Sequence, residues 1–279
     1  THGSGVRGRA SSSLFYSTPS YMELFHNQYG DSGPPFILLH GLLGAHGNWH
    51  TLSRTAFQDV ARVYAVDQRN HGRSPHADAM DYPTLATDLR RFIDRHDLAP
   101  AAVLGHSMGG KTAMQAALSH PDRVDRLIVV DMAPKAYPPH HTKLLDALAR
   151  IDPAAYDGRD EIDDVLAEDV PSWPIRQFLL KNLDYDGETY TWRMNLDAIR
   201  AHYDDITAAL PRTPTYEGPA LFVRGGASDY VADEDREGIR GRFPNAELVT
   251  IDGAGHWVHA DAPDALAEVV TDFLTEAAP

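Results

Sequence analysis

The chain contains no cysteine among its 279 residues. Disulfide bonds, thiolate catalysis and zinc sites built from cysteine are therefore excluded. No apolar run approaches the roughly 20 residues that a membrane-spanning helix requires. Basic residues are also outnumbered, with 25 Lys and Arg against 40 Asp and Glu, and the formal net charge is -15. Because such a surface repels polyanions, nucleic acid and anionic membranes are poor candidates for partners.

The start of the chain has no features of a folded or targeting segment. Thr1–Gly5 contains no initiator Met and no signal-peptide core, and a Ser-rich stretch follows it. We expect residues 1–18 to be an artificial leader and a poorly ordered tail, with a processed native leader as the alternative. The location expected for a chain without a targeting signal is the cytoplasm.

Apolar runs of strand length alternate with helical patterns, which predicts an α/β fold with a doubly wound, mainly parallel sheet. Runs such as Phe36–Leu39 are continuously apolar, as in strands that are covered on both faces. The expected strands are Met22–Tyr29, Phe36–His40, Val60–Asp67, Ala101–Gly105, Leu127–Asp131, Leu221–Gly225 and Glu247–Asp252. Helices are expected at Tyr82–Arg95 and Pro263–Glu276, where apolar residues recur every three or four positions.

The strand signal stops between Pro134 and Pro219, and helical patterns divided by prolines take its place. Prolines interrupt helices, so this region should hold short helices that meet at angles. We therefore expect residues 134–218 to form a helical lid inserted into a core made of residues 19–133 and 219–279. Its apolar side chains Trp173, Phe178 and Leu179 are candidates for walls of a substrate pocket that controls substrate size.

The segment Gly105-His106-Ser107-Met108-Gly109 lies between an expected strand and an expected helix. The chain must turn sharply here, and glycines on both sides remove Cβ atoms that would clash. Ser107 is then exposed at the tip of the turn. The N–H of Met108 lies at the start of the helix, where donors are unpaired and the dipole is positive. The pattern predicts a nucleophile beside one donor of an oxyanion hole.

A serine hydroxyl needs a base to take its proton and an acid to orient that base. His256 is the best base because its Gly-containing loop follows the last expected strand, and reactive groups gather at the carboxyl ends of strands. Two acids are available: Asp131 ends one strand, and Asp229 follows the strand expected beside it. Either could reach His256, and the other would then be a turn aspartate or a helix cap. Asp131 is the expected acid because it sits directly at a strand end, whereas Asp229 lies in a Gly-rich loop beside the competing polar Ser228.

A second glycine turn, His40–Gly44, follows the strand Phe36–Leu39. It can point the backbone N–H of Leu42 toward the site as the second oxyanion donor. The side chain of His40 is expected to bind loop backbone, and the charged groups of Asp67–Ser74 are expected to tie adjacent loops together.

No cofactor is expected. The pairs His140-His141 and His256-x-x-His259 lack carboxylate or cysteine partners at the spacing of metal ligands. The glycine-rich segments match neither a dinucleotide-binding fingerprint nor a P-loop.

Jointly, these motifs resemble the α/β-hydrolase superfamily, and within it the bacterial YbfF-type carboxylesterases and the mitochondrial abhydrolase-domain proteins of animals. The resemblance covers roughly residues 20–275 and is carried by His40–Gly44 with Asn48, Val66–Pro75, Gly105–Lys111, Asp131–Pro134, Arg176–Leu180, Gly225–Ser228 and Gly253–Ala260. It implies Ser107 as nucleophile, His256 as base and an oxyanion hole from Leu42 and Met108. In the close relatives the acid maps to Asp131, whereas most of the superfamily carries it in the later loop, where this chain has Asp229.

The interpretation that follows is a serine carboxylesterase that hydrolyses small acyl esters, or thioesters by the same chemistry, through an acyl-enzyme. One alternative is a perhydrolase or C–C bond hydrolase that uses the same triad. The other is a receptor or partner-binding protein that keeps the fold with little turnover. The expected partner is a small-molecule ester, and the sequence does not indicate an oligomeric state.

Overall fold

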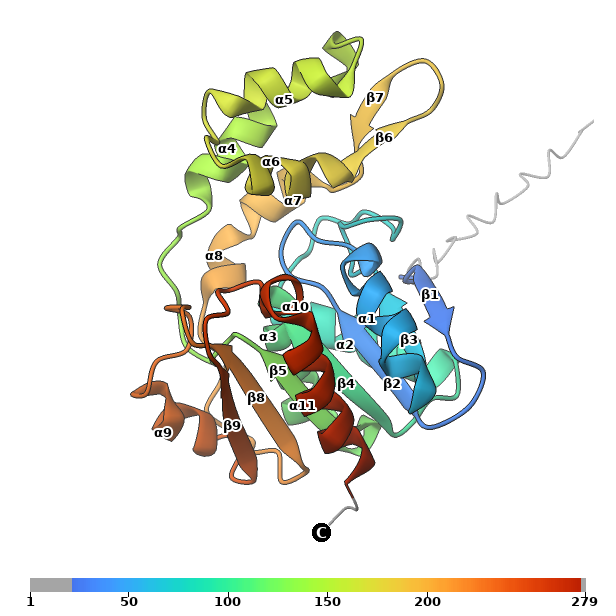
Figure 1. Cartoon of the computed structure of the whole chain (residues 1–279), viewed down its shortest axis with the longest axis vertical. Coiled ribbons are helices and arrows are strands. Elements are labelled where there is room, and N and C mark those ends of the chain that lie inside the picture. The colour runs from blue at the N-terminus through green and yellow to red at the C-terminus, as the bar shows by residue number, and fades with distance from the viewer. Residues whose placement is uncertain (1–21, 277–279) are drawn as a thin grey trace, which may run out of the picture.

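The computed structural model describes residues 22–276. Within that range a sheet of seven strands has the order β1-β3-β2-β4-β5-β8-β9 (Figure 1). Its strands are β1 (His26–Tyr29), β2 (Pro35–Leu39), β3 (Arg62–Val66), β4 (Ala101–His106), β5 (Val124–Val130), β8 (Ala220–Gly225) and β9 (Ala246–Ile251). Only β1 pairs antiparallel with its neighbour among these strands. The predicted mainly parallel sheet is confirmed, and the tail expected at residues 1–18 lies outside the described residues.

Helices cover both faces of the sheet (Figure 1). They are α1 (His50–Thr55), α2 (Tyr82–Arg95), α3 (Met108–Ser119), α9 (Asp235–Arg240), α10 (Val258–Asp261) and α11 (Pro263–Thr275). Side chains alternate between the faces along a strand. In β2, Ile37 and Leu39 belong to the apolar cluster that contains α2 and α3, whereas Phe36 and Leu38 belong to the cluster that contains α1 and α11. Burial on both faces explains the continuously apolar strand sequences.

The segment between β5 and β8 forms a separate layer above the carboxyl end of the sheet (Figure 1), and we call it the insert. It contains α4 (Thr142–Arg150), α5 (Arg159–Ala167), α6 (Trp173–Leu179), α7 (Leu196–Ala201), α8 (Tyr203–Thr207) and the strands β6 (Leu183–Tyr185) and β7 (Tyr190–Trp192). Besides the short helices, the insert contains a pair of antiparallel strands, β6 and β7, that the sequence analysis did not anticipate. Each strand has three residues, which is too short to show the alternation that identifies strands.

Hydrogen bonds from buried side chains connect the insert to the core. The Lys111 ammonium on α3 donates to the carbonyl oxygens of Thr207 (3.3 Å) and Ala208 (2.6 Å) at the end of α8. On the opposite side, Asn182 Nδ2 donates to the carbonyl oxygen of Leu43 at 2.8 Å. These contacts hold the insert directly above the loops that follow β2 and β4.

Candidate active site

Ser107 occupies the sharp turn between β4 and α3. Its backbone has φ 54° and ψ -118°, a conformation that non-glycine residues rarely adopt. The turn is tight, because a Cβ atom on Gly105 would lie 2.0 Å from the carbonyl oxygen of Gly109. A Cβ atom on Gly109 would lie 2.6 Å from the carbonyl oxygen of His40. Both glycines of the motif are therefore required by close backbone approach, and the strained turn presents the Ser107 hydroxyl at the carboxyl end of the sheet.

Three side chains from distant parts of the chain form one hydrogen-bonded line. His256 Nε2 lies 3.1 Å from Ser107 Oγ, and His256 Nδ1 lies 2.8 Å from Asp131 Oδ2. Asp131 is fully buried directly after β5, and it also accepts hydrogen bonds from the Gly225 N–H at 3.0 Å and from the Ser228 hydroxyl. A hydroxyl, an imidazole and a carboxylate in this order can remove the serine proton and stabilise the imidazolium that forms.

The two candidate acids occupy different environments. Strands β5 and β8 pair directly, so Asp131 and Asp229 both follow neighbouring strand ends, as expected from the sequence. Asp229, however, is exposed to solvent. The residue that the loop after β8 directs at Asp131 is Ser228, whose hydroxyl hydrogen bonds to the same carboxylate oxygen that contacts His256. This loop thus supplies a supporting hydroxyl to the site.

Two residues that the sequence analysis did not identify hold His256 in place. The ring of Tyr230 stacks on the imidazole, with centroids 3.7 Å apart and planes inclined by 16°. His106 Nε2 donates to the backbone carbonyl of His256 at 2.8 Å. Burial lowers the pKa of His106 well below its ordinary value, so its ring is neutral. No sequence motif marks either role, because both depend on how the loops after β4, β8 and β9 meet.

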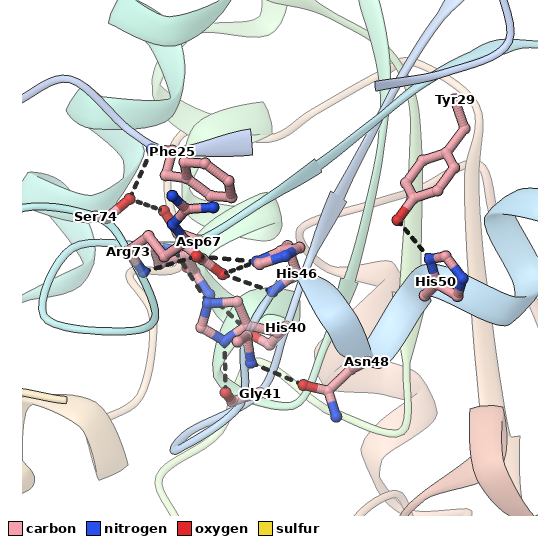
Figure 2. A network of polar contacts seen from close by, with 12 residues as sticks. Phe25, Tyr29, His40, Gly41, His46, Asn48, His50, Asp67, Arg73 and Ser74 are labelled. Carbon is pink, nitrogen blue, oxygen red and sulfur yellow. Dashed lines mark hydrogen bonds and ion pairs between the residues drawn. The ribbon is translucent and has the colours of Figure 1, made fainter. Parts of the chain in front are cut away.

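The loops after β2 and β3 are joined by a polar network around Asp67 (Figure 2). Its carboxylate accepts hydrogen bonds from the backbone and ring of His46 and from the Arg73 N–H. Burial alone would raise the pKa of Asp67, but these bonds and the nearby His40 hold it below its ordinary value. The His40 ring accepts from the Gln68 N–H and donates to the Gly41 carbonyl oxygen. The expected structural roles of His40 and of the segment that begins at Asp67 are therefore confirmed.

The two predicted oxyanion donors lie beside Ser107. Met108 is the first residue of α3, so its N–H has no partner within the helix. Leu42 lies in a turn closed by a hydrogen bond from the Gly44 N–H to the Gly41 carbonyl oxygen at 3.0 Å. Leu42, Ser107 and Met108 all line one small cavity. Both residues that the sequence predicts as oxyanion donors therefore border the space beside the Ser107 hydroxyl.

Ser107 also borders a larger cavity of about 310 Å³ under the insert. Of the expected pocket walls, Phe178 lines this cavity. Trp173 and Leu179 were wrong as walls, because Trp173 is 62% exposed on the surface and Leu179 is fully buried in the apolar core. Helix α6 turns only one of its faces to the cavity, which separates these residues. Ile175 of the same helix also lines the cavity, and Leu144 and Trp257 are walls that the sequence analysis did not identify.

Two kinds of feature are absent from the part of the chain that the structure describes, residues 22–276. Across this range, no group of three or more His, Asp or Glu side chains is placed to hold a metal ion. None of the helices described there is long and apolar enough to cross a membrane.

The sequence matches the family model for the alpha/beta hydrolase fold over residues 34–263. The chain belongs to the α/β-hydrolase family. The mouse (Mus musculus) protein named sn-1-specific diacylglycerol lipase ABHD11 is 40% identical over 249 residues, which cover 86% of this chain and 81% of that protein. The Escherichia coli K12 protein named esterase YbfF is 35% identical, covering 90% of this chain and 96% of that protein.

A solved esterase structure is also similar to this chain in both sequence and fold. A marine microorganism esterase superposes with a TM-score of 0.88 at 42% identity, and the match covers 90% of this α/β-hydrolase chain and 99% of that one. The resemblance to the esterases and abhydrolase-domain proteins of this family is confirmed.

Proposed function

We propose that this α/β-hydrolase is a serine carboxylesterase that hydrolyses small acyl esters, and thioesters by the same chemistry. The observation that carries the proposal is the line of Ser107, His256 and Asp131, which opens into an apolar-walled cavity. The names of the mouse, E. coli and marine relatives, which are lipases or esterases, support the same class of reaction.

The reaction follows from the geometry. Ser107 Oγ attacks the ester carbonyl carbon while His256 Nε2 takes its proton, and the N–H groups of Leu42 and Met108 receive the developing oxyanion. His256 then gives the proton to the leaving alcohol oxygen, and the acyl group remains on Ser107. Water, deprotonated by the same imidazole, attacks the acyl-enzyme and restores Ser107. Asp131 stays ionised and stabilises the imidazolium in both steps.

The proposal is tested by steady-state kinetics on 4-nitrophenyl acetate with Ser107→Ala. Because a triad acts as one unit, we expect kcat to fall by several orders of magnitude, roughly 10⁶-fold in the best-studied case. Ser119→Ala, at the far exposed end of the same helix, is the matched control and should retain the wild-type rate. Activity that survives Ser107→Ala would refute the proposal.

A further inference from the structure

Two cavities of very different size meet at Ser107. The larger has a volume of about 310 Å³ and the smaller about 40 Å³. Leu42, Ser107, His141 and Tyr230 line both cavities, so the two cavities adjoin at these residues. In an ester bound at Ser107, the acyl part and the alcohol part therefore lie in different cavities.

The position of the base decides which half enters which cavity. Of the two cavities, His256 lines only the larger, and Met108 lines only the smaller. His256 must pass its proton to the leaving oxygen, so the alcohol half has to lie on the His256 side. The acyl carbon is held by Ser107 Oγ, and its remaining chain then extends past Met108 into the smaller cavity.

The smaller cavity limits the length of the acyl chain. A water-sized group occupies about 10–15 Å³ by this measure of volume, so about three non-hydrogen atoms fit. Three buried side chains beyond Met108 form part of the wall, since Tyr82, Met132 and Ile206 are 4%, 5% and 7% exposed. The insert supplies the rest of the wall, including Tyr137, Pro138 and His140. Lys111, whose ammonium is bound to Thr207 and Ala208, adds a fixed wall. A packed core does not open without strain.

The larger cavity has partly buried apolar walls. Leu144, Ile175 and Phe178 come from the insert and are only partly buried, and they face Trp257 from the loop after β9. Phe178 and Trp257 lie ring to ring with centroids 5.4 Å apart. This mostly apolar space has room for a group several times larger than an acetyl or butyryl chain.

We infer that the substrates are esters of short acyl groups, of two to four carbons, with bulky and largely apolar alcohols. The inference rests on the proposed esterase function. In the acylation step the bond from Ser107 Oγ to the acyl carbon forms, and the bond from that carbon to the alcohol oxygen breaks. The serine proton passes through His256 to the alcohol, which leaves from the larger cavity. Water then hydrolyses the short acyl group that remains in the smaller cavity.

The test compares kcat/KM along two ester series. In ethyl esters from acetate to octanoate, we expect a fall of about tenfold or more beyond butyrate, since one misfit methylene costs about 10–200-fold. In acetate esters from methyl to octyl and naphthyl alcohols, kcat/KM should hold or rise with alcohol size. Long acyl chains that are hydrolysed as fast as acetate, with loss of activity on large alcohols, would overturn the inference.

Single substitutions test whether the smaller cavity sets the limit on acyl-chain length. Met132→Ala should raise the hexanoate-to-butyrate ratio, and Ile206→Ala should do the same if Met132→Ala fails to fold. Leu144→Ala enlarges the other cavity and is the matched control, which should change the alcohol series and keep the acyl limit. An acyl limit that moves with Leu144→Ala, or that ignores both smaller-cavity variants, contradicts the inference. Absence of all ester hydrolysis would instead refute the proposed function.

Discussion

At the scale of single residues, hydrogen-bond donors distinguish the carboxylate that contacts His256 from the other candidate acid. The Asp131 carboxylate is fully buried, and it accepts hydrogen bonds from the Gly225 N–H, the Ser228 hydroxyl and His256 Nδ1. Three donors fix the orientation of this buried carboxylate. Asp229 has none of this support, because its side chain is exposed.

We therefore predict unequal effects of removing the two carboxylates. Asp131→Asn should lower kcat by about 10⁴-fold, as in the serine-protease example on which this magnitude rests, because His256 loses its orienting acceptor. Asp229→Asn is the matched control and should stay within about twofold of wild type. The measurement is steady-state kinetics of both variants on one ester. A crippled Asp229→Asn beside a nearly normal Asp131→Asn would mean that the acid lies in the later loop.

These residues also show how far sequence reasoning reaches. Ser107 and His256 could be placed from the sequence, because strand ends collect at one edge of a parallel sheet. The sequence favoured Asp131 over Asp229 because it sits directly at a strand end, but Asp229 stayed an alternative because both follow neighbouring strands. The conformation of the loop from Gly225 to Tyr230 decides between them, since it turns Ser228 inward and Asp229 outward. No local propensity encodes that choice.

At the scale of elements, Lys111 connects α3 to the end of α8 without a carboxylate partner among its hydrogen bonds. Burial lowers its pKa to about 7, and the rings of Tyr82 and Tyr137 flank the ammonium. In the unfolded chain a lysine titrates near pH ~10.4. Between these two values the unfolded state binds more protons than the folded state, so the stability contribution of Lys111 increases as pH rises.

We predict that this pH dependence disappears in Lys111→Met. From pH 7 to pH 9 the free energy of unfolding of wild type should rise relative to that of Lys111→Met by on the order of 1–2 kcal/mol. Urea denaturation of both proteins at each pH measures the difference, and the lost bonds to Thr207 and Ala208 add only a constant offset. If the free energies of unfolding of the two proteins changed with pH in parallel, Lys111 would be shown to stay charged from pH 7 to pH 9.

The elements differ in how well the sequence predicts them. Helix α2 was predicted with its exact bounds, because its apolar periodicity is strong and Asp81 caps it by accepting from the Thr84 N–H at 2.7 Å. The hairpin of β6 and β7 was missed because it lies in the insert as two very short strands. Its turn contains Gly187 at φ 105°, and Asp186-Gly187 is a turn signal that a search for hairpins could have used.

At the scale of the whole molecule, the sheet and the insert contribute different parts of the site. The parallel sheet brings the loops after β4, β5 and β9 to one edge, where Ser107, Asp131 and His256 meet. The insert covers that edge and supplies walls of the larger cavity. The mainly parallel sheet followed from the alternation of strand and helix patterns. The order of its strands was not predicted, and the shape of the cavities depends on side-chain packing that the sequence pattern does not specify.

The central claim is that an acyl group is carried transiently by Ser107. The most direct measurement is mass spectrometry of protein quenched in acid during turnover of 4-nitrophenyl acetate, followed by peptide mapping. We predict one acetyl group on the peptide that contains Ser107, and its absence in Ser107→Ala. Turnover without any adduct, or an adduct on another residue together with activity in Ser107→Ala, would contradict the account.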